Sequence, residues 1–195
     1  YFYCSSLASD VLVTKAEKRV TSGRNSNTKG TDNIISNGSI ISVNAGQCMI
    51  IVDQGKVAEF CAEPGEFVYD TSTEPSLLYG DLGENIKASF AQFGRRFSFG
   101  GNTAKDQRVY YFNIKEIMNN LYGTPNPIRF HYVSANTGFE IETSVKCNGQ
   151  YTFKIVDPIL FYTNVCGNVD GEYRKGDLLS VMKAELLTKL PMALA

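Results

Sequence analysis

The only histidine in this chain of 195 residues, His131, is the first side chain to test for chemistry. Catalytic devices of the Ser-His-Asp or Cys-His type need a histidine as their general base. Nothing near His131 resembles a nucleophile turn such as G-x-S-x-G, and its neighbours alternate between polar and apolar residues, as in a β-strand. The pattern favours a structural histidine on a sheet over a catalytic base.

The five cysteines are scattered along the chain, at Cys4, Cys48, Cys61, Cys147 and Cys166. None forms the close C-x2-C pair that zinc sites usually contain. Their odd number and wide spacing also disfavour a disulfide framework. We expect buried free thiols in a reducing cytoplasm.

Two of these cysteines, Cys48 and Cys61, form a candidate redox pair. The segments 47–52 and 56–61 have the pattern of two hairpin strands around Asp53-Gln54-Gly55, where the glycine can adopt a positive φ. If the loop is only Gln54-Gly55, Cys48 lies opposite Cys61 with Cα atoms ~4.5 Å apart, at the low end of disulfide reach. A longer loop would shift this register, and we expect two reduced neighbours rather than a disulfide.

Phosphate-binding, acid–base and metal motifs are missing from the sequence. The glycine-rich segment 100–105 lacks the G-x-x-x-x-G-K-[ST] order of a phosphate loop, and no G-x-G-x-x-G occurs. Glu140 and Glu142 fall on the polar side of an alternating run, where exposure to solvent explains them. Metal sites recruit several histidines or clustered carboxylates, and neither is present. The sequence therefore predicts no enzyme, no cofactor and no metal site.

Composition argues against nucleic-acid binding and against a membrane-spanning helix. Lys and Arg number 19 and Asp and Glu 20, so the net charge is −1, without the basic signature of a nucleic-acid binder. The longest apolar stretches, 48–52 and 159–162, are far shorter than the ~20 residues of a membrane-spanning helix, and no signal peptide is visible. We expect a cytoplasmic protein. Because the chain begins without methionine and ends inside an apolar, helix-like stretch, we also expect a fragment of a longer protein.

A candidate partner surface lies between residues 82 and 97. Asp81 and Glu84 resemble a capping box that opens a helix. Apolar residues then recur at helical spacing, accompanied by basic ones. A basic amphipathic helix of this kind can lie on an anionic membrane. The candidate membrane or partner surface consists of Ile86, Lys87, Phe90, Phe93, Arg95, Arg96 and Phe97. The default, however, is that the phenylalanine face packs into the core and the basic side chains are solvated.

Strands make up most of the remaining pattern. We expect strands at 108–114 and 128–133, and an edge strand at 10–14. The strand at 47–52 is apolar on both faces, so it should be covered on both sides. From 139 to 155 the apolar residues have odd numbers, and a hairpin at Asn148-Gly149 would pair odd with even and mix the faces. We expect one long strand instead, with a bulge near Gly149.

Two helices should follow the long strand. Asp157 and Pro158 fit the N-cap and first position of a short helix that ends near Asn164. Asp177 caps a second helix, whose apolar positions are Leu178, Val181, Met182, Leu186 and Leu190. Strands first and helices last is the order of an α+β protein.

Two blocks of sequence resemble the SPFH domain, or band 7, superfamily of stomatin, prohibitin, flotillin and HflK/C. The first, 41–67, contains a Gly46-Gln47 step, the hairpin and a Pro64-Gly65 turn. The second, 139–161, contains the long strand, a Gly149-x-Tyr151 step and the Asp157-Pro158 helix start. Segments 70–75 and 164–169 resemble a bacterial subgroup described as virion core protein-like. The resemblance covers roughly residues 34–195.

The resemblance implies an α+β SPFH-like domain, a mostly antiparallel twisted sheet with helices following the long strand. The domain would span 34–176, with a family-specific insertion at 71–135. An N-terminal edge segment and polar loop (1–33) would precede it, and the start of a C-terminal helix (177–195) would follow.

The same resemblance implies no catalytic residue and no cofactor. It implies a homo-oligomer, joined through the C-terminal helix, that acts as a non-enzymatic scaffold. Such a scaffold would organise other proteins at or near the cytoplasmic face of a membrane, with peripheral membrane contact and no nucleic acid. The alternative is an intracellular binding module for a small molecule or peptide, with the aromatic segments 86–99 and 108–112 lining a groove.

Overall fold

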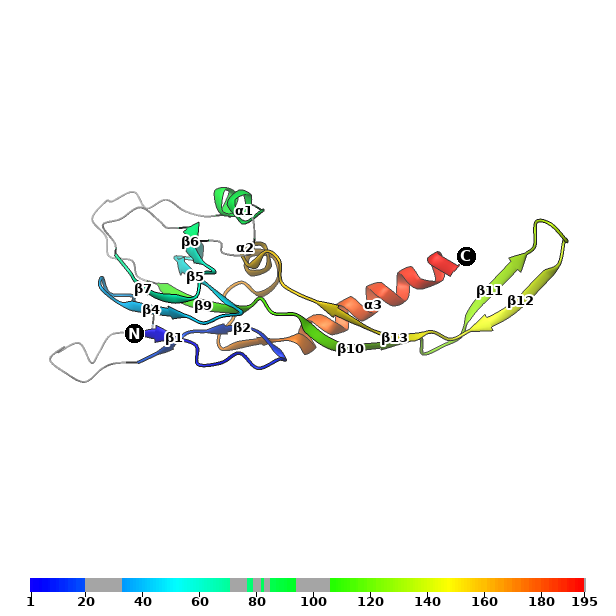
Figure 1. The fold of residues 1–195 in the computed structure, drawn as a ribbon, viewed down its shortest axis with the longest axis horizontal. Helices are drawn as coiled ribbons and strands as arrows, with labels where there is room; N and C mark the ends of the chain where they lie inside the picture. Colours follow the sequence, from blue (N-terminus) through cyan, green and yellow to red (C-terminus); the bar gives the residue numbers. More distant parts are fainter. Residues whose placement is uncertain (20–32, 71–76, 79–81, 83–84, 94–105, 195) are drawn as a thin grey trace. The chain divides into compact units, whose positions relative to one another are not determined.

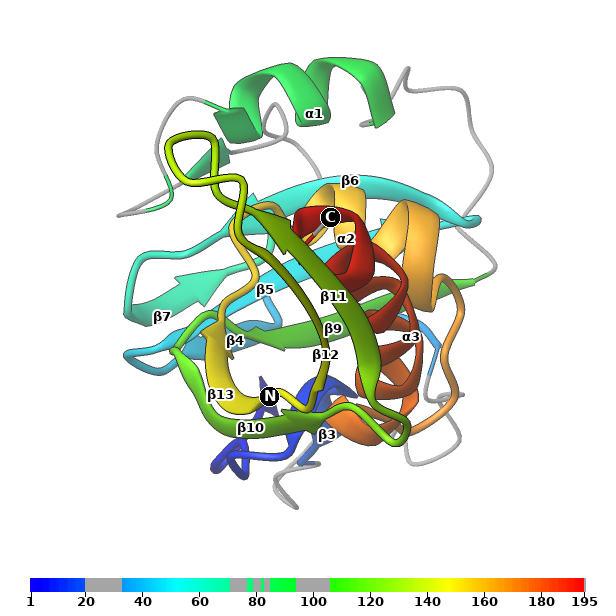
Figure 2. The ribbon, with the colours of Figure 1, turned by 90° about the vertical axis from the view of Figure 1, so that its right-hand side faces the viewer.

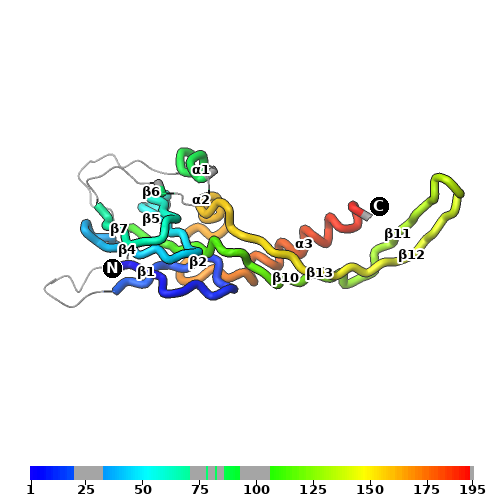
Figure 3. The backbone as a smooth tube through the Cα atoms, in the orientation of Figure 1, coloured from blue at the N-terminus to red at the C-terminus, as the bar shows by residue number. Residues whose placement is uncertain are grey.

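A computed structural model describes residues 1–19, 33–70, 77–78, 82, 85–93 and 106–194 (Figure 1). These residues form an α+β structure with mostly antiparallel sheets and a C-terminal helix, the fold class expected from the sequence. The chain divides into two compact units, and each is described by itself. Unit 1 comprises Tyr1–Lys115 and Lys154–Arg174, and unit 2 comprises Glu116–Phe153 and Lys175–Ala195. The chain leaves unit 1 after Lys115 and returns to it at Lys154. Figure 3 traces the backbone, coloured by residue number.

Unit 1 contains two sheets. The smaller has the strand order β3-β1-β4-β7, formed by Glu17–Lys18, Phe2–Tyr3, Ile40–Val43 and Gly65–Val68. The larger has the order β14-β2-β9-β5-β6-β8, formed by Glu172–Arg174, Val11–Lys15, Gln107–Asn113, Gln47–Asp53, Lys56–Cys61 and Leu77–Leu78. Neighbouring strands are antiparallel except for β1 with β4 and β6 with β8, which are parallel.

The main core of unit 1 contains buried side chains from both sheets. Its members on the smaller sheet and its loops include Phe2, Ile35, Ile41 and Val43, and those on the larger sheet include Val11, Met49, Ile51, Cys61, Val109 and Tyr111. Tyr111 also joins the sheets directly, because its hydroxyl donates a hydrogen bond of 2.6 Å to the carbonyl oxygen of Ser42 on β4. The two sheets therefore form one sandwich.

A helical segment covers the other face of the larger sheet. It consists of α2 (Pro158–Phe161) and a π-helix at Tyr162–Cys166. The ring of Tyr110 lies 5.5 Å from that of Tyr162, and the ring of Phe112 lies 6.5 Å from that of Phe161, between centroids. All seven residues of β5 are buried, which confirms that this strand is covered on both sides.

One carboxylate, that of Asp157, holds two helices in place. Its Oδ1 accepts hydrogen bonds from the backbone N–H groups of Ile159 (3.1 Å) and Leu160 (2.9 Å), which confirms the predicted N-cap with Pro158 at the first position. Its Oδ2 accepts a hydrogen bond from the buried hydroxyl of Ser89 on α1 (Asn85–Phe93). Helix α1 lies next to α2 and β6 (Figure 2).

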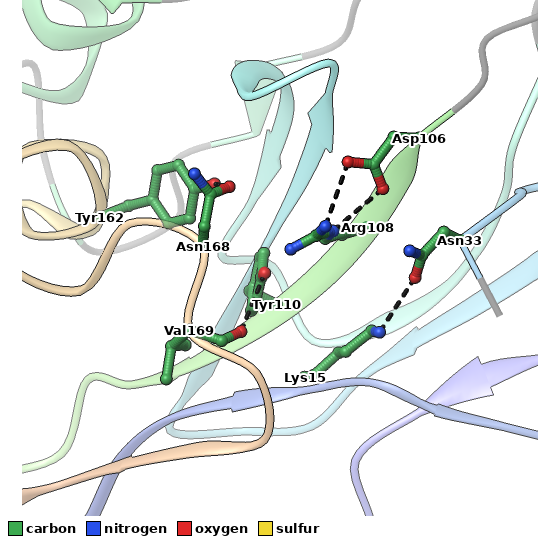
Figure 4. Close-up of polar contacts among 8 residues, drawn as sticks. All are labelled: Lys15, Asn33, Asp106, Arg108, Tyr110, Tyr162, Asn168 and Val169. Atoms are coloured by element: carbon green, nitrogen blue, oxygen red, sulfur yellow. Dashed lines mark hydrogen bonds and ion pairs between the residues drawn. The ribbon is translucent and has the colours of Figure 1, made fainter.

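Polar contacts on β9 fix the loop that follows the π-helix (Figure 4). The Tyr110 hydroxyl donates a hydrogen bond of 3.1 Å to the carbonyl oxygen of Val169. At the start of the same strand, Arg108 donates two hydrogen bonds, of 3.0 and 3.2 Å, to the carboxylate of Asp106. The loop is thus tied to the centre of the larger sheet.

The hairpin of β5 and β6 has the expected two-residue loop but also contains a bulge. Val52 pairs with Val57, whereas Ile51 pairs with Glu59, so Ala58 is an extra residue. An extra residue exchanges the two faces of the strand beyond it. The pairing of β6 with β5 is therefore displaced by one residue from Glu59 onward.

The bulge separates the two cysteines of the candidate redox pair. Met49, rather than Cys48, pairs with Cys61, so the predicted register is wrong. Cys48 pairs with Phe112 on β9 and shares the helix-covered face with it, whereas Cys61 belongs to the core between the sheets. Both thiols are buried and free. Burial raises the pKa of the Cys61 thiol to about 11, so it is protonated at neutral pH.

The predicted edge strand at 10–14 exists as β2, but it is not at an edge. It pairs with β9 on one side and with the three-residue strand β14 on the other. The sequence gives little sign of β14, because it follows directly on a glycine-rich loop. Residues from the range predicted as an insertion, 71–135, supply β8, α1 and the central strand β9.

Unit 2 consists of two antiparallel ribbons and one helix. Strand β10 (Ile117–Gly123) pairs with β13 (Asn148–Phe153), and β11 (Ile128–Val133) pairs with β12 (Glu140–Val145). Helix α3 (Lys175–Leu194) contacts β11.

The run from 139 to 155 forms two successive strands, so the expectation of one long strand is wrong. It forms no hairpin at Asn148-Gly149. Because β12 pairs with β11 and β13 pairs with β10, the parity argument is confirmed. From Val145 to Ile155 the odd-numbered residues are all less exposed than the even-numbered ones. The interruption lies at Lys146 and Cys147 instead of Gly149, and the bulge lies on the partner strand β10, between Ile117 and Asn120.

Candidate functional surfaces

The ribbon of β11 and β12 has one apolar face and one polar face. Residues directly opposite each other share a face, so Ile128, Phe130 and Tyr132 lie on the same side as Val145, Thr143 and Ile141. We call the side formed by Ile128, Phe130, Tyr132, Ile141 and Val145 the apolar ribbon face. Tyr132 is 51% exposed and Ile141 41% exposed, so part of this face is open to solvent.

The opposite side of the same ribbon carries charged residues. His131 and Glu140 lie there, with Nε2 of the histidine 2.5 Å from Oε1 of the glutamate. Both side chains are more than half exposed, and an exposed ion pair contributes at most about 1 kcal/mol. Val133, 52% exposed, is on this polar side. His131 thus lies on a surface ribbon, as the sequence indicated. Its contact with Glu140 was not evident from the sequence.

Helix α3 has one half-buried side, formed by Leu178, Leu179, Met182, Leu186, Leu187 and Leu190. Val181, which the sequence placed on the apolar side, is 57% exposed, and that prediction is wrong. Successive residues of a helix are rotated by 100°, and the half-buried side of α3 extends around the helix from Leu178 to Leu187. Leu179 falls within this side, whereas Val181 falls outside it. Met192 near the end of α3 is 73% exposed.

Unit 2 buries very little of its apolar surface. Among its described residues, only Ile117 and Asn120 have buried side chains. Large apolar side chains are exposed on both ribbons and on α3: Met118, Leu121, Tyr132, Val133, Phe139, Ile141, Val181 and Met192. Exposed apolar side chains that lie next to each other mark interaction surfaces, and Tyr132 and Ile141 lie directly opposite each other on one ribbon. Unit 2 is therefore the strongest candidate for contact with another molecule.

Gly149 allows an aromatic row on the β10–β13 ribbon. It pairs with Tyr122, whose ring lies so close that a Cβ at position 149 would come within 2.8 Å of it. The Tyr122 ring in turn lies 6.5 Å from that of Tyr151, which lies 6.4 Å from that of Phe153, between centroids. The Gly149-x-Tyr151 step noted in the sequence therefore has a packing reason.

Replacing Gly149 by alanine should weaken this ribbon by about 1 kcal/mol, because the new methyl group displaces the Tyr122 ring. Backbone amides of β10 and β13 should then exchange with solvent roughly fivefold faster, as measured by hydrogen exchange. Gly123→Ala on the same ribbon is the matched control, since its Cβ would meet atoms no closer than 3.8 Å. Equal effects of the two substitutions would contradict the packing role of Gly149.

A small cavity in unit 1, which we call the Glu59 cavity, has a volume of about 110 Å³. Apolar residues from both sheets line it, and the polar groups in its wall are Glu59, Cys61 and Tyr69. Burial raises the pKa of Glu59 from 4.5 to about 7. The cavity is not lined by 86–99 or 108–112, the segments that the sequence suggested for a groove.

The predicted surface on α1 is only partly described. Ile86 is completely buried and Phe90 is half-buried, so Ile86 belongs to the core and is not part of a surface. Lys87 is exposed. Arg95, Arg96 and Phe97, like the side chain of Phe93, lie outside the described residues. For these four residues a membrane or partner contact stays a prediction.

Two further features of the described residues bear on function. In this part of the chain, no helix combines the length and apolar character that a membrane crossing requires. Likewise, no three His, Cys, Asp or Glu side chains among the described residues are grouped so that they could hold a metal ion.

Comparison with known proteins identifies the family. The model of the SPFH domain-Band 7 family matches residues 28–195, which is most of the chain. No curated protein matches, and no solved structure matches. The family is generally non-enzymatic. The match does not separate the virion core protein-like subgroup from the rest of the family. On this match and on its α+β fold, the chain belongs to the SPFH domain-Band 7 family.

Proposed function

We propose that this SPFH domain is a non-enzymatic scaffold whose copies associate through unit 2 and organise other proteins at or near the cytoplasmic face of a membrane. The observation that carries the proposal is the apolar surface of unit 2. Its described residues include two buried side chains and eight large apolar ones that are exposed. The membrane location and the other partner proteins are supported by family membership alone.

The apolar ribbon face is the part of unit 2 that best suits self-association. Tyr132 and Ile141 lie directly opposite each other on it, and both are exposed. Burying such side chains is favourable by roughly 25 cal/mol per Å² of apolar surface. A second copy of the same face supplies a matching apolar surface, and symmetric contacts of this kind are the commonest in homo-oligomers.

Weak contacts between copies of the domain are useful to a scaffold. Each contact between two domains can be modest, while an array of copies binds a partner at many points. The half-buried side of α3 contributes further apolar surface in the same unit. Membership of a generally non-enzymatic family supports a role without catalysis.

Light scattering on the chain tests self-association. At about 100 µM we expect a mass that is a multiple of 21.6 kDa and falls on dilution. Tyr132→Glu should lower the association constant at least tenfold, roughly 1.4 kcal/mol, because it places a charge on the apolar ribbon face.

Val133→Glu is the matched control. Val133 is the next residue on β11, is exposed to the same extent and lies on the opposite, polar side. It should leave the mass unchanged. A monomer at all concentrations, or an equal loss of mass in the two variants, would overturn the proposed contact.

A further inference from the structure

We propose that the Glu59 cavity is a binding site for a primary alkylammonium group, the charged end of a lysine side chain or of a free aliphatic amine. This inference concerns unit 1 and does not depend on self-association through unit 2.

The walls of the cavity suit an aliphatic stem. Ile41 and Phe67 come from the smaller sheet, and Met49 and Leu78 come from the larger one. A single water needs about 10–15 Å³ of such space, so about 110 Å³ has room for several heavy atoms. A four-carbon chain that ends in an ammonium group is of this size.

The carboxylate of Glu59 supplies the charge that such a group needs. Among the described residues it has neither a hydrogen bond nor an ion pair, and desolvation is the one cause of its raised pKa. A half-buried carboxylate without a partner among the described residues is costly, and an opposite charge brought into contact with it offsets that cost. A ligand suited to this cavity is therefore a cation, not an anion or a neutral acceptor.

The bulge at Ala58 explains why this carboxylate lies at the cavity. Glu59 pairs with Ile51, a member of the core between the sheets. Without the extra residue Glu59 would oppose Ile50 and lie on the other face of β6. One added residue thus places a charged side chain in the wall of a cavity that is also lined by apolar residues of both sheets.

Binding should depend on pH over a narrow range. Glu59 is mostly protonated at pH 6 and mostly ionised at pH 8, since its pKa is about 7. The other titratable groups in the wall, Cys61 and Tyr69, have pKa values raised above their ordinary ones of 9.0 and 10.0, so they stay neutral over this range. The affinity for an alkylammonium ion should therefore rise about tenfold from pH 6 to pH 8.

Titration with n-butylammonium chloride, followed through the NMR signal of the Met49 methyl group, tests the proposal. We expect saturable binding in the millimolar range at pH 8, and no binding of n-butanol, which has the same stem without the charge. Glu59→Gln should abolish butylammonium binding, because it keeps the shape of the protonated side chain and removes the charge. Tyr132→Glu, a change in unit 2, should bind as the parent chain does.

A second arm distinguishes the sources of the ammonium group. If Nα-acetyl-lysine methylamide also binds, the site accepts a lysine that is part of a polypeptide, and if only butylammonium binds, it accepts free amines. Both results support the site. Equal binding of butanol, undiminished binding to Glu59→Gln, or no binding of either amine would overturn it.

Discussion

Replacing Asp157 by alanine should lower the free energy of unfolding by about 2–3 kcal/mol, the largest effect we expect from a single polar substitution. The carboxylate satisfies two backbone N–H groups at the start of α2 and also accepts from the buried hydroxyl of Ser89 on α1. Alanine removes all three hydrogen bonds. The loss of an N-cap costs about 1 kcal/mol, and a buried hydroxyl left without its partner adds about 1–2 kcal/mol.

Two further variants separate the contributions, with urea unfolding as the measurement. Asp157→Asn retains an oxygen that can cap α2, so it should cost under about 1 kcal/mol. Ser89→Ala should cost about 1 kcal/mol, and combining it with Asp157→Ala should cost less than the sum of the two. Strict additivity would show that the hydrogen bond between α1 and α2 contributes nothing to stability.

Asp157 also shows what the sequence can and cannot reveal. The cap is a local signal, because the groups it binds follow it by two and three residues, and the Asp-Pro pair predicts it. Its contact with Ser89 joins residues 68 positions apart, and no pattern in the sequence indicates it. The same distinction applies to Tyr111, whose burial is readable from an apolar strand but whose bond to Ser42 is not.

The β5–β6 hairpin shows how one residue can defeat a correct local prediction. The two strands and their Gln54-Gly55 loop are as expected, yet the register differs because Ala58 has no partner. A bulge has a small local cost and a weak sequence signal, while its effect on faces extends along the rest of the strand. This single feature separates Cys48 from Cys61 and brings Glu59 to the cavity.

In unit 2, the alternation of side chains along the strands was easier to predict than the packing of the strands and the helix. Alternation gave the two faces of 145–155 correctly, since side-chain direction follows from strand geometry alone. It did not show that β12 and β13 have different partners, or that Val181 would be exposed on α3. Both depend on which elements are available to cover an apolar face, and this is a property of the whole fold.

Replacing Glu59 by glutamine should make the chain more stable at pH 8 by about 1–2 kcal/mol and leave its stability at pH 4 nearly unchanged. The pKa of Glu59 is about 7 in the folded chain and 4.5 as the ordinary value. Below pH 4.5 the side chain is protonated in both states, so folding carries no penalty. Above pH 7 the folded chain must hold a poorly solvated charge, so this contribution to the free energy of unfolding is lost as the pH rises between the two values.

The magnitude follows from the size of the shift and the remaining exposure of the side chain. One pKa unit corresponds to about 1.4 kcal/mol, so the full shift would give about 3 kcal/mol, and access to solvent reduces it to about 1–2 kcal/mol. Urea unfolding at pH 4 and pH 8 measures the difference. The exposed Glu63, just after β6, provides a control, since Glu63→Gln should change the stability little at either pH.

A difference between Glu59→Gln and the parent that is the same at pH 4 and pH 8 would contradict this account, because it would show a packing effect and not a charge effect. A second measurement, unfolding in the presence of butylammonium, links the stability of the chain to ligand binding. If the parent loses stability between pH 4.5 and pH 7 and regains it at pH 8 on addition of butylammonium, while Glu59→Gln does neither, the carboxylate of Glu59 accounts for both results. Proton and alkylammonium ion would then compete for one group, because each removes the cost of its buried charge.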